Sequence, residues 1–270
     1  MKRWTTTTAA LAAAGALLVG SGGAASAQQP GRNGAVSYLW EYTYWMNQPC
    51  MVEGEEFPGL EPDGGVAWAR GGTVMAMTAV AAGSTQTLVL STSTCAPRSI
   101  GRADSGSTGS FSPDGKQIAV QRGGRILVVD VATGKTVRDL TAGKDPSWSP
   151  DGKRIAYVDG TTIKTRPSTG GSAATFKTSA SAPDYSPDST KIAYLTGGKI
   201  AYAAASNGSS AKTTSIKALD FTWSPDGTSF AFISPTQYVV VARTSGYITA
   251  RPTDGDTPNV RQHVAWQPLR

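Results

Sequence analysis

The sequence has 270 residues, of which 39% are hydrophobic, and a formal net charge of +6. The basic residues are scattered along the chain instead of forming a run, which argues against a nucleic-acid-binding protein. Beyond the N-terminus, no apolar segment is long enough to cross a membrane. We therefore predict a soluble, exported protein with no nucleic-acid partner and no membrane span after processing.

The first 27 residues resemble a secretory signal peptide. Lys2 and Arg3 supply positive charge, residues 9–19 form a short apolar run, and Ala-Ser-Ala ends at Ala27. The alternative is a membrane anchor, but the apolar core is short and rich in Ala and Gly. We expect cleavage after Ala27, a mature chain of residues 28–270, and a secreted or extracytoplasmic location.

An aromatic stretch, YLWEYTYWM, follows at residues 38–46. Its alternating aromatic residues would share one face of a β-strand, and they are Tyr38, Trp40, Tyr42 and Tyr44. Exposed aromatic side chains can bind sugars or proteins. The alternative is that Trp40, Tyr42 and Tyr44 pack between neighbouring sheets.

Residues 47–65 are expected to form a long, acidic surface loop. Cys50 lies in this loop, and Cys95 is the only other cysteine. In an exported chain, two cysteines favour a disulfide, here closing a loop of about 45 residues. Two unpaired thiols are the alternative.

Four copies of one ten-residue motif organise the rest of the chain. FSPDGKQIAV is followed by WSPDGKRIAY, YSPDSTKIAY and WSPDGTSFAF, and the copies begin at Phe111, Trp148, Tyr185 and Trp223. The first residue of each copy, which we call the anchor, is aromatic, and an alanine follows it eight residues later. A degenerate copy begins at Trp68, and the C-terminal Trp266 begins a half copy.

Each motif predicts a turn between two strands. Proline presets φ, aspartate bonds the nearby backbone, and glycine accepts a positive φ. The turn residues are Ser112, Pro113, Asp114 and Gly115; Ser149, Pro150, Asp151 and Gly152; Ser186, Pro187 and Asp188; and Ser224, Pro225, Asp226 and Gly227. The repeated aspartates could alternatively suggest calcium, but one acid per turn favours backbone capping.

Three or four short strands per repeat predict an all-β fold. Repeats of 37 to 43 residues suggest a six-bladed β-propeller of four-stranded antiparallel blades, forming a single domain over residues 28–270. We expect the C-terminal strand to pair with the N-terminal strands and close the ring. The closing blade would be split between about residues 34–60 and 262–270, and the protein would be a monomer.

The pattern aromatic-Ser-Pro-Asp-Gly-x-x-Ile-Ala-Tyr resembles the WD-repeat-like propeller repeat of the TolB family. Residues 111–120, 148–157, 185–194 and 223–232 carry the resemblance, which extends over nearly the whole mature chain. It implies a propeller, a fold that supports both binding and catalysis. TolB-family proteins also have an N-terminal domain, for which this chain leaves no room before residue 34.

Few residues suggest chemistry. His263 is the only histidine, and it is expected to be structural or to line the channel. Asp145 and Asp220 each lie three residues before an anchor, where they either hold an ion or water or serve as ordinary polar groups of an inner strand. We expect no catalytic residue, no metal site and no cofactor.

These observations favour a non-catalytic propeller that binds another secreted or envelope protein of a bacterium. The alternative is a carbohydrate- or small-ligand-binding protein, or a hydrolase or lyase, that uses the channel mouth. A third interpretation is a degenerate duplicate with only a structural role.

Overall fold

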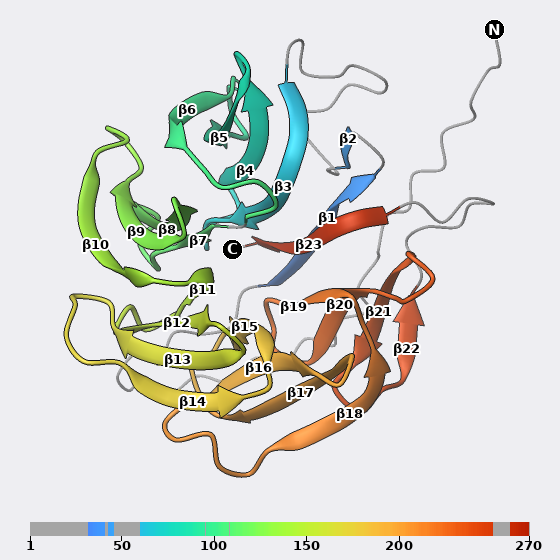
Figure 1. Ribbon diagram of the computed structural model, residues 1–270. Coiled ribbons are helices and arrows are strands. Elements are labelled where there is room, and N and C mark those ends of the chain that lie inside the picture. Colours follow the sequence, from blue (N-terminus) through green and yellow to red (C-terminus); the bar gives the residue numbers. More distant parts are fainter. Residues whose placement is uncertain are drawn as a thin grey trace, which may run out of the picture.

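All the regular secondary structure in the described residues is β-strand. The computed structural model describes residues 32–40, 43–45, 60–94, 96–107, 109–250 and 260–269. Figure 1 shows the sheets arranged around a common centre, with the C-terminal strand reaching that centre. Within these ranges, nothing forms a helix with the length and hydropathy needed to cross a membrane.

Five sheets are four-stranded antiparallel blades, each formed by consecutive strands. The first has β3 (Leu60–Trp68), β4 (Val74–Ala81), β5 (Ser84–Ser91) and β6 (Arg98–Arg102). The second has β7 (Ser110–Phe111), β8 (Gln117–Arg122), β9 (Arg125–Asp130) and β10 (Thr136–Ala142). The third has β11 (Lys144–Trp148), β12 (Arg154–Asp159), β13 (Thr162–Pro167) and β14 (Ala174–Thr178). The fourth has β15 (Ser181–Tyr185), β16 (Lys191–Thr196), β17 (Lys199–Ala204) and β18 (Lys212–Lys217). The fifth has β19 (Asp220–Trp223), β20 (Ser229–Ile233), β21 (Val239–Arg243) and β22 (Ile248–Ala250).

The two ends of the described chain meet in a further sheet of three strands. It contains β1 (Arg32–Trp40), β2 (Thr43–Trp45) and β23 (Val260–Leu269), in the order β2-β1-β23. The blue β1 and the red β23 lie side by side in Figure 1. Their antiparallel pairing runs from Arg32 opposite Leu269 to Trp40 opposite Val260.

The prediction of six four-stranded blades is therefore wrong, because the described residues form five. The aromatic stretch at residues 38–46 does not form one long strand: β1 ends at Trp40, and β2 returns antiparallel with Thr43 opposite Trp40. The resulting strand β2 has only three residues. The acidic stretch 47–65 also differs from the expected loop, because its residues from Leu60 onward belong to β3.

The repeated alanine has a clear packing role between neighbouring sheets. Ala156 is fully buried in a cluster with Tyr185, the anchor of the next blade, and Ala193 is fully buried with Trp223. The same arrangement recurs in the pairs Ala76–Phe111, Ala119–Trp148 and Ala231–Trp266. A small side chain on one sheet thus makes room for a large aromatic ring from the next.

Enlarging one of these alanines should destabilise the contact between two blades. We expect Ala156→Leu to lower the free energy of unfolding by about 2 kcal/mol, because extra methylene groups have no space in a filled core. Chemical denaturation of the variant would measure the change. Ala173→Leu is the matched control, since Ala173 is exposed and should change stability by less than about 0.5 kcal/mol. Equal losses in the two variants would contradict the packing argument.

Each Ser-Pro-Asp turn is held by the same side-chain hydrogen bonds. In the second copy, the Ser149 hydroxyl donates to Asp151 Oδ1 at 2.7 Å and accepts from the Arg154 amide at 2.9 Å. Asp151 Oδ1 also accepts from the Lys153 amide at 3.0 Å. The serines and aspartates at 112 and 114, 186 and 188, and 224 and 226 make equivalent bonds.

The degenerate copy keeps the turn without these side chains. The Ala69 amide donates to the Val74 carbonyl at 2.8 Å, and the Gly72 amide donates to the Ala69 carbonyl at 2.8 Å. The equivalent backbone bonds in the second copy also measure 2.8 Å. The backbone alone can therefore form the turn, and Ser and Asp add stability to it.

Removing one turn hydroxyl should weaken the fold without abolishing it. Ser149 is buried in a turn whose other residues are partly exposed, and Ser149→Ala leaves the amide of Arg154 without its side-chain acceptor. The loss should cost about 1 kcal/mol of unfolding free energy. Denaturant titration would measure the loss. Ser172→Ala, at an exposed position, provides the control. A variant as stable as the parent protein would show that the hydroxyl contributes nothing beyond the backbone turn.

Candidate functional site

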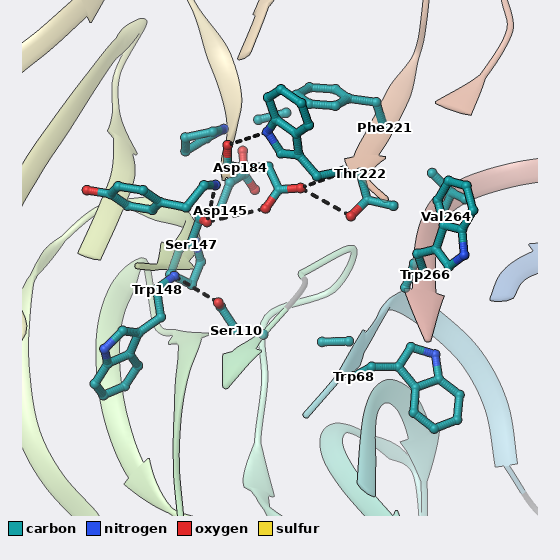
Figure 2. Close-up of a pocket in the computed structure, with 18 of the residues that line it drawn as sticks. Trp68, Ser110, Asp145, Ser147, Trp148, Asp184, Phe221, Thr222, Val264 and Trp266 are labelled. Carbon is teal, nitrogen blue, oxygen red and sulfur yellow. Dashed lines mark hydrogen bonds between the residues drawn. The ribbon is translucent and has the colours of Figure 1, made fainter. Parts of the chain in front are cut away.

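A cavity of about 660 Å³ lies where the inner strands converge. Strands β3, β7, β11, β15, β19 and β23 all contribute lining residues. One end of the cavity is rimmed by five prolines: Pro113, Pro150, Pro187 and Pro225 of the turns, and Pro268 of β23. We call this set the proline rim. Figure 2 shows the polar and aromatic side chains that surround the cavity.

Side chains bridge neighbouring inner strands around this cavity. In three blades, the side chain of the residue just before the anchor accepts a hydrogen bond from a neighbouring blade. The donor is the backbone amide of the anchor of the following blade. The donor and acceptor pairs are Trp148 N to Ser110 Oγ at 2.8 Å, Tyr185 N to Ser147 Oγ at 3.1 Å, and Trp223 N to Asp184 Oδ2 at 3.0 Å. An inner strand has one edge without a β-ladder partner, so these bonds satisfy amides there and fix one blade against the next.

Of the three side chains that accept these bonds between blades, Asp184 has the most hydrogen-bond partners. Its Oδ2 also accepts from the Thr222 hydroxyl at 3.1 Å, and the Ser147 hydroxyl lies 3.5 Å from Oδ1 (Figure 2). The indole of Trp223 donates to the backbone carbonyl of Asp184 at 3.2 Å. The carboxyl group lies deep in the ring, yet the residue retains some accessible surface because it lines the cavity.

Burial raises the pKa of the Asp184 carboxyl to about 6. Hydrogen bonds from Trp223 and Thr222 lower this pKa, and the negative charge of Asp220 raises it further. Loss of hydration therefore outweighs the hydrogen bonds, since hydration favours the charged form. A carboxyl group that titrates near pH 6 can be protonated or ionised under ordinary conditions, which suits it to sense or bind charge in the cavity.

The predicted pair Asp145 and Asp220 also lines the cavity. Asp220 Oδ2 accepts from the Val264 amide at 3.0 Å, so it bridges to β23. Asp145 has a positive φ of 51° in a bulged part of β11. The described residues contain no group of three His, Cys, Asp or Glu side chains that could hold a metal ion. An ion or water site at Asp145 and Asp220 stays a prediction.

The structure describes the backbone of some of the other predicted binding residues and leaves the rest undescribed. His263 lies within β23, Trp40 ends β1, and Tyr44 lies opposite Leu39 on β2. Tyr42, Cys50 and Cys95 lie outside the described residues, so the predicted disulfide and the proposed aromatic face stay predictions.

Two residues of the cavity were not predicted from the sequence. Asp184 immediately precedes an anchor, in the position that Ser110 and Ser147 occupy in other blades, and this acidic replacement was the available signal. Arg70 occupies the motif's proline position in the degenerate copy. Its guanidinium Nη1 donates to the Pro150 carbonyl at 3.3 Å, and burial lowers its pKa. Arg70 therefore places a positive charge beside the proline rim.

Many solved structures are similar to this chain, and two of them illustrate the likeness. The crystal structure of TolB from Acinetobacter baumannii has a TM-score of 0.66 and 19% sequence identity, covering 86% of this chain and 66% of the TolB chain. A chain in the crystal structure of a nidogen–laminin complex has a TM-score of 0.66 and 12% identity, covering 86% of this chain and 98% of that one.

Sequence comparison gives no corresponding match. No protein-family model matches the chain, and neither does any curated protein. At 19% and 12% sequence identity, similarity to these solved structures establishes the fold of this chain. It does not establish the activity, because one fold can support many functions. The resemblance inferred from the repeated motif is confirmed at the level of fold: the protein is a TolB-like β-propeller.

Proposed function

We propose that the protein is a secreted or envelope-associated, non-catalytic propeller that binds another protein. The observation that carries this proposal is the proline rim around a central cavity, held by hydrogen bonds between inner strands. Proline has a restricted backbone, so a partner that docks on the rim orders little additional chain. The rim also provides an apolar surface, and Arg70 provides an adjacent charge.

The structural comparisons support a binding role. The similar chain in the nidogen–laminin structure belongs to a complex of two proteins, and it corresponds to this chain over 98% of its length. The chain covers only 66% of TolB, so any activity of that whole protein is a weaker guide. The charged and apolar N-terminal segment supports export, which would place the propeller outside the cytoplasm.

The binding role can be tested with two matched double variants. The immobilised protein would capture partners from envelope and secreted fractions of the producing cell. We expect Pro113→Arg with Pro187→Arg to abolish capture of a specific protein, because both changes place bulk and charge on the rim. Val137→Arg with Ile248→Arg adds the same charge on outer strands, at side chains 43% and 46% exposed, and should leave capture intact.

Thermal unfolding of both double variants would show that each remains folded. Specific capture that survives the rim changes would contradict docking on the rim. Failure to capture any protein reproducibly, or saturable turnover of a small molecule by the isolated chain, would contradict the proposed function itself.

A second candidate function is binding or conversion of a carbohydrate or other small ligand at the channel mouth. The raised pKa of Asp184 in a cavity of about 660 Å³ favours this alternative. A panel of glycans and metal ions should then include one compound that raises the melting temperature. That shift should disappear in Asp184→Asn if the cavity binds the ligand, or in Trp40→Ala if the aromatic stretch binds it.

A further inference from the structure

The residues immediately before the six anchors lie at one level of the central cavity. All six line it, and they are Ala67, Ser110, Ser147, Asp184, Thr222 and Ala265. Four consecutive blades supply side-chain oxygen atoms at this level, and we call Ser110, Ser147, Asp184 and Thr222 the polar arc. The first blade and the terminal sheet supply only the methyl groups of Ala67 and Ala265, which complete the ring.

Asp184 is the one charged member of the polar arc. Its Oδ2 accepts from the Trp223 amide at 3.0 Å and from the Thr222 hydroxyl at 3.1 Å. Among the described residues, its Oδ1 has only the Ser147 hydroxyl, 3.5 Å away (Figure 2). The two oxygens of a carboxylate can together accept about four hydrogen bonds. Oδ1 can therefore accept further bonds from a group held in the cavity.

No cationic side chain pairs with this carboxyl group in the part of the chain that the structure describes. The salt bridges found there join partly exposed side chains, and none includes Asp184. Burial raises the pKa of Asp184 to about 6, and the negative charge of Asp220 adds to the rise. At pH 7 the group is therefore mostly ionised. Since buried charges in proteins are usually paired, a cation in the cavity would stabilise the ionised form.

The two ends of the cavity differ in charge. Inner strands run toward the turns, so their first residues lie at the mouth away from the proline rim. Asp145 and Asp220 lie at that mouth together with Lys144. Arg70 lies at the proline rim, where it donates to the Pro150 carbonyl. A small cation is repelled by Arg70 and attracted by the two aspartates, so it would enter from the mouth opposite the rim.

The volume and the rest of the lining favour an organic ligand. About 660 Å³ is within the range of cavities that hold drug-sized molecules. The described residues offer no group of three His, Cys, Asp or Glu side chains for a metal ion. Apolar side chains form much of the wall, among them Pro146, Pro183, Leu219, Phe221 and Val264. A ligand that fits this cavity combines a positive charge with an apolar body.

We propose that the central cavity binds a small organic cation, an alkylammonium or guanidinium compound, whose N–H groups donate to Asp184. Its carbon skeleton would pack against Ala67, Ala265 and the apolar wall. This proposal rests on the second candidate function, ligand binding at the channel mouth, and narrows the class of ligand. A neutral sugar could also bond to the polar arc, but it would leave the charge of Asp184 uncompensated.

Three six-carbon probes of different charge test the proposal on the full chain. They are hexylammonium, 1-hexanol and hexanoate, and isothermal titration calorimetry would measure the dissociation constant of each at pH 7. A hydrogen bond to a buried charge should favour hexylammonium over 1-hexanol by about tenfold or more. Hexanoate should bind most weakly, because its charge has the same sign as that of Asp184.

Two variants with the same change in net charge identify the group responsible. Asp184→Asn should weaken hexylammonium binding by between about tenfold and a hundredfold. Asp139→Asn removes a carboxylate from the outer strand β10, where Asp139 pairs with Arg125 and is about half exposed. This control should leave the dissociation constant within about threefold of the parent value. Thermal unfolding would establish that both variants fold.

The pH dependence of binding is a second measurement, which the parent protein alone can provide. Hexylammonium keeps its charge from pH 5 to pH 7, as a lysine side chain does. Because protonation of Asp184 removes the binding charge, the parent should bind hexylammonium about tenfold more weakly at pH 5 than at pH 7. Asp184→Asn should lose this dependence. The other titratable side chains of the lining are Arg70, Lys144, Asp145, Tyr185 and Asp220.

Several results would overturn the proposal. They are equal binding of hexylammonium and 1-hexanol by the parent, equal losses in the two variants, and a pH dependence that persists in Asp184→Asn. If hexylammonium failed to bind while a glycan raised the melting temperature, the cation would be excluded and the second candidate function would stand. If neither the probes nor any glycan or metal ion bound, both would be contradicted.

Discussion

Replacing Gly72 with alanine should unfold the protein at a temperature lower by about 10 °C. Gly72 has a φ of 66°, and an added Cβ would overlap the carbonyl oxygen of Pro268 in β23. The Gly72 carbonyl also accepts a hydrogen bond from the Gln267 side chain at 2.8 Å. We expect a loss of about 3–5 kcal/mol, combining backbone strain with displacement of the C-terminal strand.

Gly83→Ala separates these two effects. Gly83 has a similar φ of 74°, but an added Cβ would have no neighbour within 4 Å. Its replacement should therefore cost only the backbone strain, about 1 kcal/mol. Scanning calorimetry of both variants would measure the difference. Similar melting temperatures for Gly72→Ala and Gly83→Ala would show that the contact with β23 contributes little to stability.

Asp184→Asn should change how stability depends on pH. The folded-state pKa of Asp184 is raised to about 6 from the ordinary value of 3.8, so the folded state binds this proton more tightly than the unfolded state. The resulting stabilisation is present below about pH 4 and is lost as the pH rises through 6, a change of about 3 kcal/mol. Asparagine does not titrate, and it keeps an oxygen to accept from the Trp223 amide.

The prediction is therefore a difference between two stability curves. From pH 4 to pH 7, Asp184→Asn should gain about 3 kcal/mol relative to the parent protein, as measured by denaturant titration. Asp188→Asn is the control, because the pKa of Asp188 is shifted in the opposite direction to that of Asp184. Burial opposes the shift, but hydrogen bonds from the Ser186 hydroxyl and the Thr190 amide lower the pKa of Asp188. That variant should lose stability relative to the parent as the pH rises toward about 4, and should change little from pH 4 to pH 7. Parallel curves for Asp184→Asn and the parent protein from pH 4 to pH 7 would contradict the assignment.

The repeated motif predicted the propeller because the contacts that form each turn are between residues close together in the sequence. A turn such as Ser149 to Gly152 is formed by residues close in sequence, and the alanine eight residues after each anchor marks a packing site. The number of complete blades was not predicted correctly, because the terminal sheet lacks a full repeat. The number and length of the strands in this sheet depend on how β1, β2 and β23 pair, which the motif does not encode. The chain reverses between Trp40 and Thr43, and β2 has only three residues.

The site was less predictable because it depends on contacts between blades. Asp145 and Asp220 were selected for their spacing before an anchor, and both line the cavity. The importance of Asp184 follows from its contacts with Thr222 and Trp223, which are 38 and 39 residues away along the chain. Motif spacing places residues on a strand, but the burial that raises a pKa depends on the assembled ring.

The pairing of β1 with β23 also affects the order of folding. Arg32 lies opposite Leu269, so this contact closes almost the entire described chain into one loop. The four-stranded blades contain mainly short-range hairpins and can form as the chain emerges during synthesis. The last sheet must wait for the C-terminal strand, and closing so long a loop has a high entropic cost. We therefore expect the blades to form an open arc before β23 (Val260–Leu269) pairs with β1, and that pairing to close the ring.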